Sequence, residues 1–287
     1  MLRFLILFSV LLLFGCQNKS LDNHKEFKRV ALVIANRDYG DNSLKNPIND
    51  ALGVQETLEK IGFDVTLETD ITLFQFNTIL DEFKKKIEPD NSIVFFYFAG
   101  HGNTLTQKSS EEYLMMTDKN QKVFVSIYKI YEFLNYAKAR HNIVTIDACR
   151  DYHQSYVPIE VGMGQTFRGD FRANIRVGEG KIKNELVVYD NNYSDTFPRS
   201  TIISYATMHN QMAKDWSKYD TTHSPYTRQL IKYLDDKEIP IEEVFRRIRV
   251  ALIAETNRLQ INLEENSLEK NVWLVPREGQ VAFSPPI

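Results

Sequence analysis

Short apolar runs alternate with helix-spaced apolar positions along most of the chain. The runs are four to eight residues long and rich in Val, Ile and Phe, as in strands that are buried on both faces of a parallel sheet. The expected strands are residues 29–36, 63–68, 92–99, 113–116, 142–147, 201–206 and a closing one at 272–275.

Between these strands, apolar residues recur at helical spacing and follow recognisable start signals. Ser, Thr and Asn accept hydrogen bonds from the first helical N–H groups, and Pro fits the first turn. The expected helices begin near Asn46, Thr72, Ser126, Ser224 and Pro240. The alternation predicts an α/β fold with a mostly parallel central sheet and helices on both of its faces.

The pattern fades between residues 151 and 199, a stretch with five glycines, several basic residues and no clear period. We predict that most of it is a long loop, which separates residues 29–150 from residues 200–287. Loops of that length are usually functional or mobile.

The first residues are typical of an export signal. A basic start is followed by eleven residues, 4–14, in which Ser9 alone is polar. As a helix they would span about 16 Å, too short to cross a bilayer, so the segment is read as a secretory signal. It ends Phe14-Gly15-Cys16, which resembles the lipobox of bacterial lipoproteins.

The lipobox resemblance implies an exported bacterial lipoprotein that is anchored in a membrane, on the periplasmic face or at the cell surface. Residues 1–15 would be the signal peptide, Cys16 the lipidated residue and residues 16–28 a polar tether. The alternative is a plain signal peptide with an incidental cysteine.

Composition narrows the class of protein. The chain has 35 Lys and Arg against 38 Asp and Glu, a net charge of −3, whereas nucleic-acid binders carry a clear positive excess. With 43% hydrophobic and 25% charged residues it is not a disordered chain. Two cysteines, Cys16 and Cys149, exclude a disulfide framework.

Two reactive side chains directly follow expected strands. Strand 92–99 continues into Gly100-His101-Gly102, and strand 142–147 into Ala148-Cys149. A single Cys is most often a small core residue and a single His a turn residue. In a parallel α/β sheet, however, reactive groups gather beyond the carboxyl ends of the strands, so the pair predicts a cysteine nucleophile with a histidine beside it.

These residues resemble motifs of the caspase, metacaspase and paracaspase superfamily. Ala99-Gly100-His101-Gly102 looks like its histidine motif, and Asp147-Ala148-Cys149-Arg150-Asp151 shares the Ala-Cys-Arg core of the caspase cysteine motif. Further resemblance lies in residues 44–51, 204–207, 224–227 and 241–249. It implies a caspase-like three-layer sandwich, in which 29–150 corresponds to the large subunit, 151–199 to the intersubunit linker and 200–287 to the small subunit.

The resemblance also implies a function, that of a cysteine endopeptidase acting on proteins or peptides. Cys149 would attack the scissile carbonyl to form a thioester, and His101 would shuttle protons. The N–H groups of Gly102 and Cys149 would form the oxyanion hole. The chemistry needs no metal or cofactor; a calcium requirement, known in some metacaspases, is left open by the sequence.

Three acidic residues match the pocket of relatives that cut after basic residues: Asp50, Asp147 and Asp215. Carboxylates in a cluster can bind a guanidinium in a bidentate way, so we expect cleavage after Arg first and Lys second. The resemblance places Ser204, Tyr205 and Ala206 among the substrate-binding residues as well.

Other readings remain open at this point. The chain could be a catalytically silent caspase-like binding module, or a cysteine peptidase of the legumain or gingipain type. Members of the superfamily are often cut between their two parts and can form homodimers through the last strand. Basic residues in the expected loop are candidate self-cleavage points: Arg168, Arg172, Arg176, Lys181 and Lys183.

Overall fold

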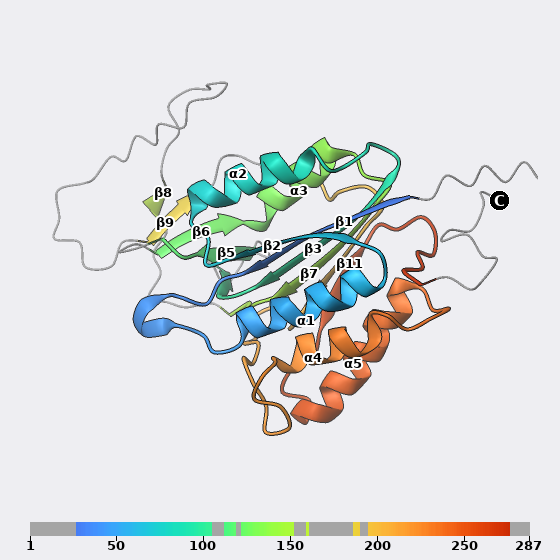
Figure 1. Cartoon of the computed structure of the whole chain (residues 1–287). Coiled ribbons are helices and arrows are strands. Elements are labelled where there is room, and N and C mark those ends of the chain that lie inside the picture. The colour runs from blue at the N-terminus through green and yellow to red at the C-terminus, as the bar shows by residue number, and fades with distance from the viewer. Residues whose placement is uncertain are drawn as a thin grey trace, which may run out of the picture.

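The computed structural model describes residues 27–104, 112–118, 122–151, 159–160, 186–189 and 195–275. Its main sheet has six strands in the order β11-β10-β7-β3-β1-β2 (Figure 1). Neighbouring strands are parallel except for β11, which runs antiparallel to β10. The bounds are β1 Lys28–Ala35, β2 Asp64–Thr69, β3 Ser92–Ala99, β7 His141–Asp147, β10 Thr201–Tyr205 and β11 Leu263–Asn266.

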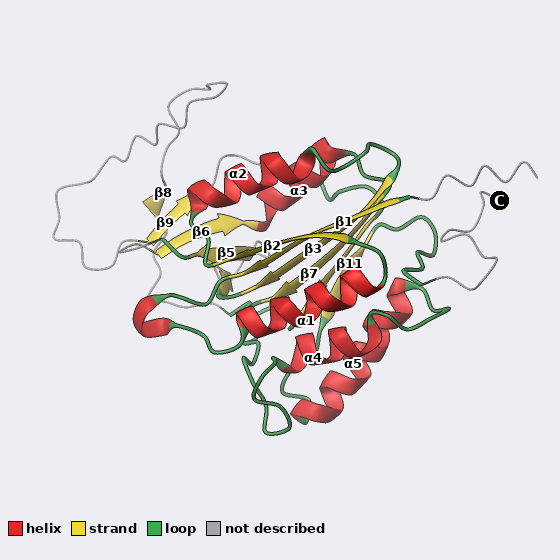
Figure 2. Ribbon diagram, in the orientation of Figure 1, coloured by secondary structure: helices red, strands yellow, loops and turns green. Residues whose placement is uncertain are grey.

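Helices cover both faces of this sheet, as Figure 2 shows. On one face lie α2 (Leu73–Lys84) and α3 (Ile127–Ala137). On the other lie α1 (Pro47–Lys60), α4 (Pro225–Tyr233) and α5 (Ile241–Thr256). The predicted α/β sandwich of three layers is therefore confirmed.

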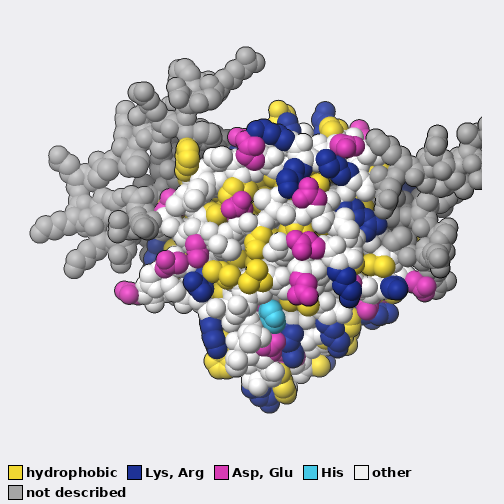
Figure 3. Space-filling view, in the orientation of Figure 1, with side chains coloured by type: hydrophobic (Ala, Val, Ile, Leu, Met, Phe, Trp, Pro, Cys, Tyr) yellow, Lys and Arg dark blue, Asp and Glu magenta, His cyan; other side chains and the backbone are white. Residues whose placement is uncertain are grey.

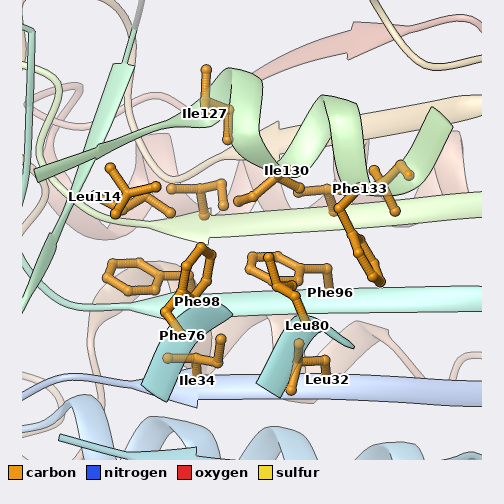
Figure 4. Packing of buried hydrophobic residues seen from close by; sticks show 14 of the residues in the cluster. Leu32, Ile34, Phe76, Leu80, Phe96, Phe98, Leu114, Ile127, Ile130 and Phe133 are labelled. Carbon is orange, nitrogen blue, oxygen red and sulfur yellow. The ribbon is translucent and has the colours of Figure 1, made fainter. Parts of the chain in front are cut away.

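The central strand β3 carries the two cores because its side chains alternate between them. Phe96 and Phe98 point toward α2 and α3 and meet Phe76 and Leu80 in Figure 4. Phe95 and the other alternate residues pack under α1 and α4. Every residue of β3 is buried, and each buried large apolar side chain stabilises the fold by about 2 kcal/mol.

The helices begin where the sequence predicts. Thr72 accepts a hydrogen bond from the Gln75 N–H, and the Gln75 side chain bonds back to Thr72, a capping box. Ser126 and Ser224 cap α3 and α4 with their hydroxyl oxygens, which accept the N–H groups of Tyr128 and Thr227. The α1 and α4 helices also have Pro in their first turn.

A second sheet of five strands in the order β4-β5-β6-β9-β8 lies beside the carboxyl ends of the main strands (Figure 1). It consists of β4 Gly102–Thr104, β5 Glu112–Met116, β6 Lys122–Ser126, β8 Ile159–Glu160 and β9 Leu186–Tyr189. Two of these strands, β8 and β9, fall within 151–199, where the sequence predicts mostly loop. They have only two and four residues, too few to show a period.

The closing strand of the main sheet is not where we expect it. It is β11, Leu263–Asn266, and not 272–275. An edge strand exposed to solvent needs no apolar run, and β11 has a single apolar residue, Leu263. Val272 and Leu274 are buried, but they pack against the α1, α4 and α5 side of the core.

The predicted signal peptide, Cys16 and most of the tether lie outside the described residues. Within the described part of the chain, no helix combines the length and apolar character needed to cross a bilayer. On the face seen in Figure 3, acidic and basic side chains are interspersed, and no patch of one sign gathers there.

Candidate active site

The pairing of β3 with β7 brings His101 and Cys149 together. Ala99 pairs with Asp147, and the Gly100 N–H extends the ladder by donating to the Asp147 carbonyl at 3.2 Å. His101 and Cys149 each follow that last pair by two residues. Both line a cavity of about 70 Å³. Its other walls include Leu44, Pro47, Asp50, Asp147, Ala213, Lys214, Asp215 and Ser224.

The histidine is held in one tautomer by its surroundings. His101 Nε2 lies 2.8 Å from the Asn42 carbonyl oxygen, which can only accept, so Nε2 carries the hydrogen. The other nitrogen, Nδ1, then holds a lone pair. Burial lowers the pKa of His101 below its usual value, so the ring is neutral at pH 7 and can act as a base.

The glycines on either side of His101 are required by close packing. A Cβ at Gly100 would lie 2.5 Å from the Tyr39 hydroxyl, and one at Gly102 would lie 2.6 Å from the Cys149 carbonyl oxygen. The Tyr39 hydroxyl accepts from the His101 N–H and donates to the Met115 carbonyl, both at 3.1 Å. Sequence reasoning missed Tyr39, which precedes His101 by more than 60 residues in the chain.

The pairing of β4 with β5 sets the direction of the Gly102 N–H group. The Met115 N–H donates to the His101 carbonyl, and Gly102 lies opposite Leu114 one step further along the ladder. In an antiparallel pair, hydrogen-bonded and non-hydrogen-bonded positions alternate. The Gly102 N–H therefore points away from β5, to the side on which the Thr104 N–H donates to the Asp151 carbonyl at 3.1 Å.

The cysteine thiol is protonated in this arrangement. Cys149 Sγ lies 3.6 Å from the Ala213 carbonyl oxygen, to which it donates. Burial raises the pKa of the thiol to about 11. A nucleophile with this pKa does not ionise by itself at pH 7, so it needs a base to take its proton.

Two of the predicted acids are buried in the cavity wall. Asp50 Oδ1 accepts from His223 Nδ1 and from the Ser224 N–H, both at 3.0 Å. Asp147 Oδ2 accepts from the hydroxyl of Thr227 at 2.6 Å and from that of Ser224. Burial raises the pKa of Asp50 to about 6 and that of Asp147 to about 7.

The third acid, Asp215, lines the same cavity but is also a structural cap. Its two carboxylate oxygens accept the backbone N–H groups of Lys45 at 2.7 Å and Asn46 at 3.2 Å, just before α1. Asn46 in turn donates its side-chain N–H to the Asp215 carbonyl at 2.6 Å. The structure thus brings all three predicted acids together, and it assigns Asp215 a contact that the sequence does not show.

Comparison with known proteins identifies the family. Residues 28–273 match the family model described as "Caspase domain". The chain belongs to the caspase family. This match favours the caspase branch over the legumain or gingipain type. A search of curated proteins found no match.

Solved caspases share the fold of this caspase domain. It is similar to caspase-1 from Spodoptera frugiperda, with a TM-score of 0.59 and 11% identity over 89% of this chain and 93% of that one. It is also similar to the Drosophila initiator caspase Dronc, with a TM-score of 0.57 and 12% identity over 87% of this chain and 85% of that one.

The predicted substrate residues of β10 are placed differently from the acids. In this caspase domain Ser204, Tyr205 and Ala206 are buried, and none of them lines the cavity. Ser204 accepts a hydrogen bond from the Tyr226 hydroxyl at 2.9 Å. The Tyr205 ring lies 3.8 Å from the guanidinium carbon of Arg150. A role in binding substrate stays a prediction for these three.

Arg150, the residue after Cys149, has a structural role that sequence reasoning missed. Arg150 is 1% exposed and forms an ion pair with the buried Glu112 of β5. Its side chain donates to the Thr207 carbonyl at 3.2 Å, and its backbone N–H donates to Gln211 at 2.9 Å. Burial raises the pKa of Glu112 to about 7, although Arg150 acts to lower it. Arg150 thus joins the cysteine loop to residues 207–211.

Proposed function

We propose that this caspase domain is a cysteine endopeptidase that cuts after Arg or Lys, with Cys149 as nucleophile and His101 as base. One observation carries the proposal. The β3–β7 register puts both side chains at one cavity whose wall holds Asp50, Asp147 and Asp215.

The reaction begins with proton transfer from Cys149 Sγ to the Nδ1 lone pair of His101. The sulfur attacks the scissile carbonyl carbon, and the oxyanion receives hydrogen bonds from the N–H groups of Gly102 and Cys149. One donor of this kind is worth about 3–4 kcal/mol in the transition state. His101 returns the proton to the departing amine, which leaves a thioester, and then activates the water that hydrolyses it.

The buried acids support a preference for basic residues. Protein donors hold Asp50 Oδ1 and Asp147 Oδ2, and no described residue donates to the other oxygen of either carboxylate. Two such oxygens can accept the parallel N–H groups of a guanidinium. A Lys ammonium group would neutralise the carboxylate charge but could not form the two parallel hydrogen bonds, so Arg should be preferred.

The test uses the full chain, purified as wild type and as Cys149→Ala, with fluorogenic peptides ending in Arg, Lys or Asp, with and without calcium. We expect hydrolysis after Arg and Lys in the wild type and none in the variant. Hydrolysis after Asp would keep the nucleophile and exclude the acidic pocket. Hydrolysis that persists in Cys149→Ala would exclude the mechanism.

A silent binding module is the second candidate, because the Cys149 thiol is partly buried, protonated and hydrogen-bonded to a carbonyl. A covalent thiol probe discriminates between the two. Labelling of Cys149 that is faster than that of free cysteine at pH 7, and that His101→Ala slows, supports the enzyme. Absence of labelling and of hydrolysis supports the binding module.

Two further proposals concern location and assembly. We propose that Cys16 is lipidated and tethers the chain to a membrane after export, as its Leu-Phe-Gly-Cys context suggests. Mass spectrometry of the native protein would show the lipid on the new N-terminal Cys16.

We also propose a homodimer through β11, an edge strand of the main sheet, to be tested by analytical ultracentrifugation.

A further inference from the structure

A histidine with no role in the proposed chemistry contacts the acidic pocket. His223 lies just before α4, and its Nδ1 is 3.0 Å from Asp50 Oδ1. Its side chain is 26% exposed, so the ring exchanges protons with solvent. Asp50 itself is only 2% exposed at its side chain, so its charge depends on what the protein places beside it.

Backbone contacts fix the position of the ring. The His223 N–H donates to Asp220 Oδ1 at 3.3 Å, and the N–H of the next residue, Ser224, donates to Asp50. A Cβ built on Gly53 of α1 would lie 3.3 Å from His223 Cε1, so the ring packs against that helix one turn after Asp50. His223 is therefore held at Asp50 by both α1 and its own loop.

The charges around the ring favour its protonated form. Asp50 on α1 and Asp220 in the same loop raise the pKa of His223. Arg228 on α4 and burial of the ring lower it, and the balance is an increase above the usual value. Across the cavity, the negative charge of Asp215 raises the pKa of Asp50, and the charges of Asp50 and Asp215 raise the pKa of Asp147.

We propose that His223 is a specificity-determining residue that keeps Asp50 ionised beside Asp147, so that the pocket holds two carboxylates for a cationic substrate side chain; this rests on the proposed function. Two buried carboxyl groups that interact suppress each other's ionisation, and a cation hydrogen-bonded to one of them relieves this. His223 does so from outside the cavity, since it does not line the wall and takes only Oδ1 of Asp50.

The test compares His223→Asn, which keeps an N–H donor and removes the charge, with wild type between pH 6 and pH 8. Lys60→Gln is the matched control. It removes a positive charge from the exposed C-terminal end of α1, the helix that contains Asp50. With an Arg substrate, we expect His223→Asn to lose at least about fivefold in kcat/KM at pH 6 through KM, and to approach wild type at pH 8. Lys60→Gln should stay within about twofold of wild type throughout. Parallel pH profiles for His223→Asn and wild type would overturn the proposal.

A binding measurement separates this proposal from the proposed function. Benzamidine is a guanidinium-like cation that cannot be cleaved, so its affinity reports on the pocket without turnover. We expect weaker binding to His223→Asn than to wild type at pH 6, by the same factor as in kcat/KM. Equal affinity, or no binding to wild type, overturns the role of His223. Normal benzamidine binding without peptide hydrolysis would instead overturn the peptidase function.

Discussion

At the scale of single residues, the cavity wall contains buried carboxyl groups, and burial opposes their ionisation. Asp147 is 6% exposed, and two hydroxyl groups are its hydrogen-bond donors among the described residues. Burial raises the pKa of Asp147 from about 4 to about 7. The folded protein therefore holds the proton more tightly than the unfolded chain, and ionisation destabilises it.

Asp147→Asn should make the protein more stable and less active. The wild type loses stability as pH rises from about 4 to about 7, because Asp147 ionises. The variant keeps that stability, because Asn retains an oxygen acceptor and carries no charge. We expect about 1–3 kcal/mol more unfolding free energy at pH 8 and no gain below pH 4, by urea titration. Asp64→Asn, at an exposed carboxyl, is the control and should change little. Cleavage after Arg should fall at least about tenfold; a destabilised but fully active Asp147→Asn would contradict the assignment.

Gly102→Ala tests the close approach of the histidine motif to the cysteine loop. The added methyl would lie 2.6 Å from the Cys149 carbonyl oxygen and 2.7 Å from Ala148 Cβ, so one of the two segments must move. A shift of the oxyanion donor should lower kcat by about 100-fold or more, with a smaller change in KM. Far-ultraviolet circular dichroism should show that the fold is retained. Activity within a few-fold of wild type would exclude Gly102 as the donor.

At the scale of elements, a buried ion pair joins three pieces of the chain that surround the site. Arg150 follows Cys149, Glu112 begins β5, and the Thr207 carbonyl follows β10. Both charged groups are almost fully buried, and the Tyr205 ring covers the guanidinium. Removing Arg150 would leave the buried Glu112 carboxylate with only the partly exposed His209, 3.3 Å away, as a cationic neighbour among the described residues, which costs more than removing both charges.

Arg150→Met should therefore destabilise the protein by about 3–5 kcal/mol, measured by urea unfolding. Arg150→Met combined with Glu112→Gln should recover part of that loss, because the uncompensated carboxylate is then absent. The single variant should also lose activity at temperatures where it is folded, since the Arg150 side chain holds the residue next to Cys149 against Thr207. Additive effects of the two substitutions would show that the ion pair does not couple them.

At the scale of the whole molecule, the sequence predicts elements that have a local or repeating apolar pattern. It misses exposed strands and contacts between residues far apart in the chain. Apolar runs identify β1, β3 and β7 because both faces of these strands are buried. The same signal is absent from β11, an edge strand with the sequence Leu-Glu-Glu-Asn, and from the short β8 and β9.

The site shows the same division. The motifs at His101 and Cys149 predict the paired side chains, because each directly ends a strand. The contact of Asp215 with Lys45 spans 170 residues, and that of His223 with Asp50 spans 173. The sequence also does not distinguish a buried arginine such as Arg150 from one that is exposed to solvent. Such contacts follow from the packing of α1 against the loop before α4, which local patterns do not encode.

The register of β3 against β7 has a consequence for how this protein can change over evolution. The chain leaves β3 at His101, builds β4, β5, β6 and α3, and returns through β7 to Cys149. Backbone hydrogen bonds between the two strands set the register of His101 and Cys149, and the excursion contacts this region through β5, at Met115 and Glu112. The parts of the excursion other than β5 can therefore lengthen, shorten or acquire new surfaces for partners while His101 and Cys149 stay in place. Peripheral segments can then diverge in sequence while the residues at the centre of the site stay the same.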